Sequence, residues 1–275
     1  MPGMDIYPGK EDKLIYEKTS ALQEIRIFDK RNGFRYMTLN GVQHGGHLPG
    51  RPERLVLPYF RSALAALIFL DQPRDYLFIG LGMGALPAFM RVVQPGARVD
   101  VVEIDPAVLE TAEVWFGLNQ DEKLHVTVGD GREFIQHTER RYDAVFLDAY
   151  RDLGVPSHLT TLEFMQEVKA VLKPGGVVVS NLWGSVVNLL FGACARTLQE
   201  AFPRLHQFRS YTYNYIFVAE TNEAEMTPGE ILSRAKKVTS SMDLGFDLVE
   251  LVRKNYTPAT EMEFHAEGLR DPKPA

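Results

Sequence analysis

The stretch YLFIGLGMGALPAF, residues 76–89, contains the turn that decides the fold of this chain. An apolar run ends at Gly80, and Gly82 and Gly84 follow at alternate positions before a helical pattern begins at Ala85. A glycine-rich turn between a strand and a helix directs backbone amides toward a ligand at the carboxyl end of the strand. The turn alone fits a dinucleotide, a phosphate or a sulfonium nucleoside, so the rest of the chain must discriminate among them.

On the C-terminal side of this turn, short apolar runs alternate with helical stretches. The runs that read as further strands occupy residues 98–104, 124–130, 142–149 and 175–182. Near-continuous apolar strands that are separated by helices are typical of a parallel sheet buried on both faces. We therefore predict an α/β fold with a doubly wound, mostly parallel sheet for residues 51–220.

The N-terminal region has a different pattern. Residues 13–40 contain short runs rich in β-branched and aromatic residues, and the pair Asn32 and Gly33 favours a tight hairpin turn. We predict a small antiparallel β-domain over residues 1–50. The stretch 41–52, which is rich in Gly, Pro and His, is interpreted as a connector.

Helices are expected on both sides of the central region. Residues 55–70 read as a mostly buried helix. Residues 227–238 and 247–256 have the pattern of two surface helices, and the last dozen residues of the chain look frayed. We group residues 221–275 as a C-terminal helical extension.

Composition and charge exclude several classes of protein. The 275 residues carry a formal net charge of −6 and contain no run of five or six like charges, so we expect no nucleic-acid surface. Cys194 is the single cysteine, and residues 1–14 lack an apolar signal region, which together predict a cytoplasmic location. The most apolar region, residues 176–195, contains polar residues and internal glycines and reads as a strand followed by a helix, so no membrane span is expected.

Acidic residues follow the predicted strands at the edge where the glycine turn lies. Glu103 ends the second strand, where a carboxylate can accept both hydroxyls of a ribose. Asp105 precedes Pro106, a pair typical of a helix N-cap, so we assign Glu103 to a ligand and Asp105 to structure. Asp130 ends the third strand, and it either accepts a hydrogen bond from an adenine amino group or forms a turn with Gly131.

Two further polar side chains occupy positions that require partners. Asp148 follows an apolar run and faces the crevice where open α/β sheets bind ligands. An isolated carboxylate is costly to bury there, which favours a functional role. Gln23 shares the apolar face of an accessory strand with Ile25 and Ile27, so its amide also needs a partner.

Six motifs, taken in order, resemble the spermidine-synthase-like group of class I S-adenosylmethionine transferases. They are LQEIRIFD, GLGMG, VVEIDP, GDGREF, YDAVFLDAY and LKPGGVVVSN. The resemblance implies a Rossmann-like class I methyltransferase fold behind a small N-terminal β-domain, a bound S-adenosylmethionine or its decarboxylated form, no metal, and a homodimer. It also implies that the nucleoside or the reacting amine is held by Gln23, Gly80, Gly82, Met83, Gly84, Glu103, Asp130, Gly131 and Asp148.

The stretch VEIDPAVLETAEVWFG, residues 102–117, also resembles the spermidine-synthase-like domain of a eukaryotic elongation-factor N-terminal methyltransferase. This second resemblance implies that the scaffold need not make polyamines.

The chain departs from the family pattern in the residues that handle polyamines. Aminopropyltransferases carry an acid inside the glycine turn, and here that position is Met83, which removes a repulsion against the carboxylate of intact S-adenosylmethionine. The family segment DSSDPxGP is replaced by DAYRDLGVPSHL, residues 148–159, which keeps Asp148 and places Arg151 at the second acidic position. The Asp-Glu-Phe and His of the polyamine pocket are missing from residues 51–62.

These departures predict methyl transfer from intact S-adenosylmethionine to an amine-type small-molecule or peptide acceptor. Aminopropyl transfer from the decarboxylated form is the alternative. Asp148 is expected to orient the nucleophile or to take its proton, and Tyr150 and His158 are further catalytic candidates on the same loop. Tyr150 equally suits packing against the nucleoside, and His158 equally suits capping the helix that follows it.

Two interpretations from other classes stay open. The glycine turn and Glu103 would suffice for a nicotinamide-dependent oxidoreductase, although Asp130 and the segment after Asp148 argue against it. The missing polyamine residues also fit a catalytically inactive nucleoside-binding module. The spacing of His44 and His47 suits a metal, but no cluster of acids or cysteines accompanies them, so we interpret them as loop residues.

Overall fold

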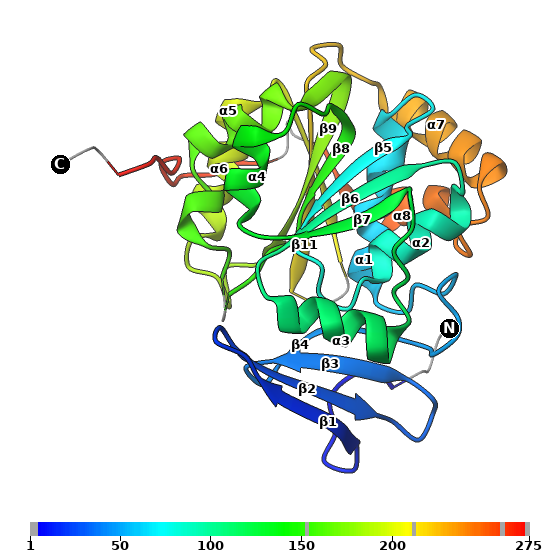
Figure 1. Ribbon diagram of the computed structural model, residues 1–275. Coiled ribbons are helices and arrows are strands. Elements are labelled where there is room, and N and C mark those ends of the chain that lie inside the picture. Colours follow the sequence, from blue (N-terminus) through cyan, green and yellow to red (C-terminus); the bar gives the residue numbers. More distant parts are fainter. Residues whose placement is uncertain (1–4, 152–153, 211–212, 259–261, 273–275) are drawn as a thin grey trace.

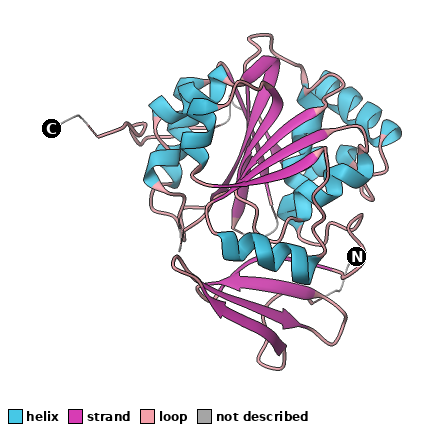
Figure 2. Cartoon of the chain, in the orientation of Figure 1, coloured by secondary structure: helices cyan, strands magenta, loops and turns pink. Residues whose placement is uncertain are grey.

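The chain forms a small antiparallel sheet and a large, mostly parallel sheet covered by helices (Figures 1 and 2). The computed structural model describes residues 5–151, 154–210, 213–258 and 262–272. The small sheet has the order β1-β2-β3-β4. Its strands are β1 (Lys13–Thr19), β2 (Glu24–Asp29), β3 (Arg35–Leu39) and β4 (Val42–His47).

Strand β4 lies within the stretch that we predicted to be a connector, and that prediction was wrong. The turn before β4 is formed by Asn40 and Gly41, which have φ angles of 49° and 80°. Two successive positive φ angles are what a two-residue hairpin turn requires. At the predicted hairpin, Gly33 has a positive φ of 84° and the loop is longer. The sequence contains Asn-Gly at both places, so the dipeptide alone could not distinguish them.

The large sheet confirms the predicted α/β class. Its order is β12-β10-β11-β9-β8-β5-β6-β7, and β11 runs antiparallel to both of its neighbours. Strands β9, β8, β5, β6 and β7 pair in parallel. The strands are β5 (Asp75–Ile79), β6 (Arg98–Glu103), β7 (Leu124–Val128), β8 (Tyr142–Leu147), β9 (Leu172–Trp183), β10 (Arg204–Arg209), β11 (Asn214–Glu220) and β12 (Tyr256–Thr257).

Alternating side chains along the strands build one core on each face of this sheet. Phe78 and Phe146 belong to the core formed with α1, η1, α2, α7 and α8, whereas Ile79 and Leu147 belong to the core formed with α4, α5 and α6. The helices are α1 (Pro58–Ala63), η1 (Leu64–Phe69), α2 (Ala85–Val93), α3 (Pro106–Phe116), α4 (Gly131–His137), η2 (Ser157–Leu159), α5 (Leu162–Ala170), α6 (Phe191–Ala201), α7 (Pro228–Ser241) and α8 (Leu248–Asn255). The helix predicted at residues 55–70 is therefore present as α1 and η1, and η1 is a 3-10 helix whose six residues are all buried.

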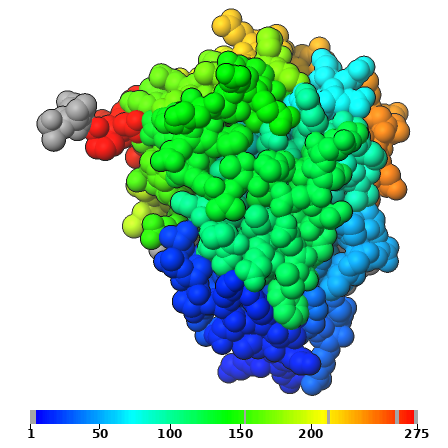
Figure 3. All heavy atoms as spheres, in the orientation of Figure 1, coloured from blue at the N-terminus to red at the C-terminus, as the bar shows by residue number. Residues whose placement is uncertain are grey.

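The small sheet packs against α3 beneath the carboxyl ends of the parallel strands (Figures 1 and 3). A shared core joins Ile25 and Met37 of the small sheet to Val108 and Phe116 of α3 and to Met83 of the glycine turn. The predicted N-terminal β-domain therefore lies next to the carboxyl ends of the parallel strands, where the candidate ligand residues are.

The C-terminal segment does not fray over its described part, contrary to our expectation. Leu269 packs against the core beneath α5 and α6, and its carbonyl accepts a hydrogen bond from the amide of Leu162 at 2.9 Å. Asp271 forms an ion pair with Arg132 at 2.6 Å. This docking depends on contacts between residues distant in sequence, which local patterns do not report. Within the described ranges, no helix is long and apolar enough to cross a membrane.

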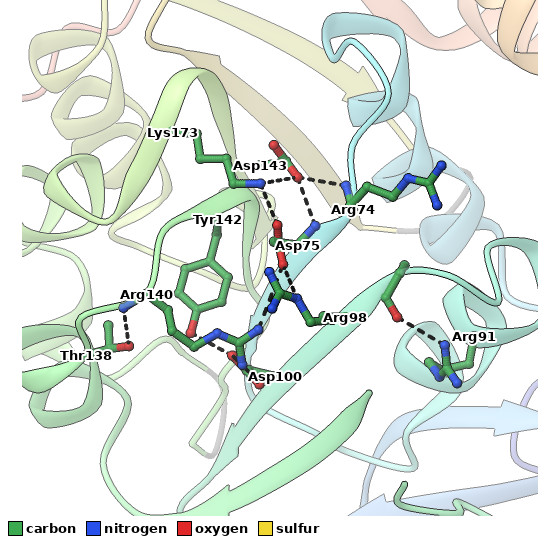
Figure 4. A network of polar contacts seen from close by, with 11 residues as sticks. Arg74, Asp75, Arg91, Arg98, Asp100, Thr138, Arg140, Tyr142, Asp143 and Lys173 are labelled. Carbon is green, nitrogen blue, oxygen red and sulfur yellow. Dashed lines mark hydrogen bonds and ion pairs between the residues drawn. The ribbon is translucent and has the colours of Figure 1, made fainter. Parts of the chain in front are cut away.

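The amino ends of the parallel strands are tied together by charged side chains (Figure 4). Lys173 Nζ contacts Asp75 Oδ2 at 2.5 Å and Asp143 Oδ2 at 2.9 Å, and Arg98 Nε contacts Asp75 Oδ1 at 2.7 Å. Burial by itself would raise the pKa of Asp75, but Lys173 and Arg98 outweigh it and lower that pKa. The network lies at the sheet edge opposite the glycine turn, so it fixes strand positions without contacting the candidate site.

Candidate active site

A cavity of about 430 Å³ lies at the carboxyl ends of β5, β6 and β8. The glycine turn and α2 form one wall, the ends of β6 and β8 form another, and residues of β4 and of the segment before β2 close it from the small sheet. Of the predicted site residues, Gln23, Gly80, Gly82, Met83, Glu103, Asp130, Gly131, Asp148, Tyr150 and His158 line this cavity. Gly84 stands at the edge of the turn and lines a second, smaller cavity.

The glycine turn adopts a backbone that side chains would obstruct. Gly80 has a φ of 98°, and a Cβ at this position would lie 2.5 Å from the carbonyl oxygen of Asp148. Gly84 has a φ of 78° and is the N-cap of α2. A Cβ on Gly131 would meet the Cγ2 atom of Ile79 at 2.4 Å. The close approaches at Gly80 and Gly131 bring the ends of β5, β7 and β8 together around one space.

Glu103 is buried at the end of β6 and holds the turn in place. Its Oε2 atom accepts a hydrogen bond from the amide of Leu81 at 3.0 Å, and its Oε1 atom accepts one from the amide of Asp105 at 2.9 Å. Burial raises the pKa of this carboxyl group. A hydrogen bond from the amide of Gly82 opposes that rise. A carboxylate has about four acceptor sites, so Glu103 keeps capacity for a ligand hydroxyl.

Asp105 has the structural role that we predicted for it, and it also binds Gln23. One oxygen caps α3 by accepting from the amide of Ala107 at 3.0 Å. The other accepts from Gln23 Nε2 at 3.0 Å and from Ser20 Oγ at 2.6 Å. The partner that Gln23 needs is therefore Asp105 in this structure, and Gln23 lines the cavity from that position.

Asp130 combines two contacts at the far end of the cavity. Its Oδ1 atom caps α4 by accepting from the amides of Arg132 and Glu133 at 2.8 and 3.1 Å. Its Oδ2 atom accepts from His158 Nε2 at 2.9 Å. Burial would raise the pKa of Asp130, but these hydrogen bonds outweigh it and lower that pKa. Thr161 caps α5, so the capping role considered for His158 does not apply.

Asp148 has an environment suited to proton transfer. Burial raises its pKa to about 6, and the hydrogen bond from Asn181 Nδ2, at 2.7 Å, opposes that rise. Tyr150 lies beside it with its hydroxyl already engaged by β9: the hydroxyl donates to the carbonyl of Asn181 at 2.8 Å and accepts from the amide of Trp183 at 3.0 Å. The Tyr150 ring stacks on Trp183 with centroids 4.7 Å apart. These contacts favour positioning for Tyr150 over proton transfer.

Sequence reasoning missed two lining residues, His44 and Tyr59. His44 lies on β4 with its ring centroid 6.3 Å from that of Tyr150, and burial lowers its pKa to about 4. The Tyr59 hydroxyl donates to the His44 carbonyl at 3.2 Å. The sequence signal that could have placed His44 at the site is the pair of glycines that follows it. A Cβ on Gly45 would lie 2.7 Å from the Met83 side chain, so the glycine allows β4 to approach the glycine turn closely.

Two residues that depart from the family pattern, Met83 and Arg151, lie at this cavity. Met83 is 3% exposed and lines the cavity, and Arg151 lines it as well. Residues 152 and 153 of the replaced segment lie outside the described residues. Across the described ranges, no group of three or more His, Cys, Asp or Glu side chains is arranged to hold a metal.

Comparison with known sequences finds two kinds of relative. Residues 63–221 match the Spermine/spermidine synthase domain. A polyamine aminopropyltransferase of Vibrio vulnificus is 31% identical over 207 residues, which cover 72% of this chain and 68% of that protein. An eEF1A lysine and N-terminal methyltransferase of Danio rerio is 40% identical over 122 residues, which cover 41% of this chain but 18% of that protein. The chain thus spans less than a fifth of the length of that methyltransferase.

Two solved structures share the fold of this chain. Human Methyltransferase-like protein 13 in complex with SAH aligns with a TM-score of 0.63 and 28% identity, over 69% of this chain and 93% of the other. A probable spermidine synthase of Corynebacterium glutamicum aligns with a TM-score of 0.75 and 17% identity, over 94% and 96% of the two chains. The second alignment confirms the Rossmann-like fold, including the small N-terminal sheet, across nearly the whole chain.

Proposed function

The chain belongs to the spermine/spermidine synthase family, and from this premise we propose that it transfers a methyl group from S-adenosylmethionine to an amine-type small-molecule or peptide acceptor. One observation carries the choice of reaction. Among the described residues that line the cavity, the carboxylates are Glu103, Asp130 and Asp148, and the first two already bind backbone amides of the nucleotide-binding loops. Asp148 is left to meet the acceptor, whereas a cationic diamine requires several carboxylates.

The positions of Glu103, Asp130 and the glycine turn around the cavity support the proposed cofactor contacts. Glu103 accepts hydrogen bonds from the ribose hydroxyls, and Asp130 accepts one from the adenine amino group. The amides of the glycine turn face the nucleoside tail. When bound, S-adenosylmethionine supplies a methyl carbon activated by its sulfonium, and its sulfur keeps the electron pair of the broken bond as the acceptor nitrogen forms the new one.

Asp148 acts at the acceptor in this proposal. As the new bond forms, its carboxylate takes a proton from the nitrogen, which a pKa near 6 allows at neutral pH because the group is ionised there. Asn181 and Tyr150 orient Asp148 and the loop that carries it. His158 contacts Asp130, so we assign it to the adenine end rather than to proton transfer.

Calorimetric titration tests the choice of cofactor. We expect wild type to bind S-adenosylmethionine more tightly than its decarboxylated form, and Met83→Asp to reverse the preference. An acid at residue 83 would repel the cofactor carboxylate by about 4 kcal/mol at ~4 Å and an effective dielectric constant of about 20. Tighter binding of the decarboxylated form by wild type would contradict the proposal.

Aminopropyl transfer is the second candidate, and the identity to the Vibrio vulnificus protein over 72% of this chain favours it. An inactive nucleoside-binding module is the third. It would bind S-adenosylmethionine without forming a product on any amine or peptide acceptor. We also propose that the chain forms a homodimer and acts in the cytoplasm.

A further inference from the structure

The described C-terminal segment, residues 262–272, is held against α5 and α6 by specific hydrogen bonds (Figure 1). The amide of Leu269 donates to Thr197 Oγ1 of α6 at 2.7 Å. Two residues further along, the amide of Asp271 donates to Glu163 Oε2 of α5 at 2.9 Å. These contacts place the Asp271 side chain at the N-terminal end of α5, the end that lies nearest to the candidate active site.

Asp271 binds Arg132, which lies at the start of α4. Arg132 Nη1 and Nη2 donate to Asp271 Oδ1 and Oδ2 at 2.8 and 2.6 Å. Its Nε and Nη2 atoms donate to Glu167 Oε2 and Oε1 at 2.8 and 2.7 Å. The Arg132 side chain is 14% exposed, and Asp271 and Glu167 together outweigh burial and raise its pKa. Two carboxylates that each bind in a bidentate manner hold the guanidinium in one orientation.

Arg132 contacts both members of the pair formed by His158 and Asp130. Its Nη1 atom donates to the carbonyl of His158 at 3.2 Å, and its amide donates to Asp130 Oδ1 at 2.8 Å. The His158 ring donates from Nε2 to Asp130 Oδ2 at 2.9 Å. The three residues thus form a closed set of hydrogen bonds, and His158 and Asp130 both line the cavity.

The His158 side chain depends on this support because packing holds it weakly. Its element, η2, has three residues and begins after Pro156 without a capping side chain. Leu159 anchors η2 in the core, but the His158 side chain itself is 44% exposed. A side chain at a binding site keeps a single orientation when hydrogen bonds behind it fix its backbone and its ring. The bond from Arg132 fixes the backbone, and the bond to Asp130 fixes the ring.

We propose that Asp271 is a positioning residue for the nucleoside end of the cavity. Through Arg132 it holds His158 on Asp130, and His158 keeps the Asp130 carboxylate directed at the bound base. The inference rests on the proposed function, because that function places the adenine of the cofactor at Asp130. Asp271 is not among the residues that line the cavity, so it acts on affinity through Arg132 alone.

Titration of Asp271→Asn with two ligands tests the assignment. S-adenosylmethionine and methylthioadenosine share the adenine and the ribose but differ in the amino-acid tail. We expect both dissociation constants to rise about fivefold, because the substitution removes the charge that orients Arg132. Asp271→Glu keeps the carboxylate and should recover most of the affinity for both ligands.

A double-mutant cycle distinguishes positioning from a general loosening of the segment. In His158→Ala the ring contact with Asp130 is absent, so the addition of Asp271→Asn should weaken binding no further. Arg270→Gln is the matched control. It breaks a contact of the same segment with Glu200, at 2.7 Å, and should change neither affinity.

Thermal unfolding establishes first that each variant is folded at the temperature of the titration. Arg132→Lys keeps the positive charge between the two acids but loses the bidentate contacts. It should raise both dissociation constants in the same way, and it carries the test if Asp271→Asn does not fold.

The outcomes separate the two proposals. Unchanged affinity in the folded variant, a loss for one ligand only, or a further loss in the His158→Ala background would overturn the positioning role of Asp271. An equal loss in Arg270→Gln would also overturn it, and each of these results leaves methyl transfer intact. Failure of wild type to bind either ligand would overturn the proposed function, and the positioning role with it.

Discussion

The proposed proton transfer depends on the environment of one residue, Asp148. A carboxylate with an ordinary pKa is a weak base, and burial raises that of Asp148 to about 6. The group must be ionised to accept a proton, so kcat is expected to fall as pH drops through about 6. Asp148→Asn should lower kcat by about 100-fold or more and abolish this acid limb, as measured in a pH profile of kcat.

Asn181 supplies the matched control for this profile. Its amide donates to Asp148 and opposes the rise in pKa, so Asn181→Ala should move the acid limb to a pH above that of wild type. If kcat of Asp148→Asn and of Asn181→Ala still falls at the same pH as that of wild type, a group other than Asp148 controls the fall.

Asp130 has two roles that a pair of variants can separate. Asp130→Ser retains a side chain able to cap α4, whereas Asp130→Ala loses the cap, which costs about 1 kcal/mol of unfolding free energy. Both variants lose the acceptor proposed for adenine, so both should bind S-adenosylmethionine more weakly by about 1–3 kcal/mol. Denaturant unfolding and calorimetry measure the two effects. Normal affinity in Asp130→Ser would leave Asp130 with its cap alone.

At the scale of elements, the glycine turn is held by its close approach to β8. Gly80→Ala combines a positive φ with a contact of 2.5 Å to the backbone of Asp148. It should lower the free energy of unfolding by about 2–4 kcal/mol. Gly82→Ala is the control, because it has a φ of 54° but nothing within 4 Å, and should cost about 1–2 kcal/mol. Equal losses in denaturant unfolding would show that the approach to β8 adds nothing.

The elements that the sequence predicted are those whose pattern is local. Strands β5, β6, β7 and β8 have largely apolar runs separated by helical stretches, so their identity and parallel pairing could be predicted. Strand β4 has two glycines at its centre and no apolar alternation, and so it resembled a connector. Tyr59 and His44 reach the cavity from α1 and β4, and their meeting depends on how the small sheet docks. The pairing of Asp130 with His158 depends on the same kind of distant contact.

Across the whole chain, the charged network that we expect to stabilise the large sheet lies at the amino ends of its parallel strands. The candidate active site lies at their carboxyl ends. Lys173 neutralises Asp75 and Asp143 at the amino ends of the strands (Figure 4). Lys173→Met should lower the free energy of unfolding by about 1–3 kcal/mol, because both acids lose a partner, while kcat stays unchanged. Lys254→Met, which breaks an exposed pair with Glu250, should cost less than about 0.5 kcal/mol in the same unfolding experiment.

A fall in kcat of the folded Lys173→Met protein would show that the two edges are coupled. The carboxyl-edge geometry also depends on the docked C-terminal segment, because Arg132, which binds Asp271, donates to the His158 carbonyl at 3.2 Å. Arg132 and Asp271 are 139 positions apart in the sequence, and no sequence pattern predicted their contact.

The mass of the product distinguishes methyl transfer from aminopropyl transfer. Purified protein is incubated with amine and peptide acceptors and either S-adenosylmethionine or its decarboxylated form, and the acceptors are then analysed by mass spectrometry. We predict an acceptor that gains a methyl group from S-adenosylmethionine with wild type and not with Asp148→Asn. An acceptor that gains an aminopropyl group from the decarboxylated cofactor would contradict the account.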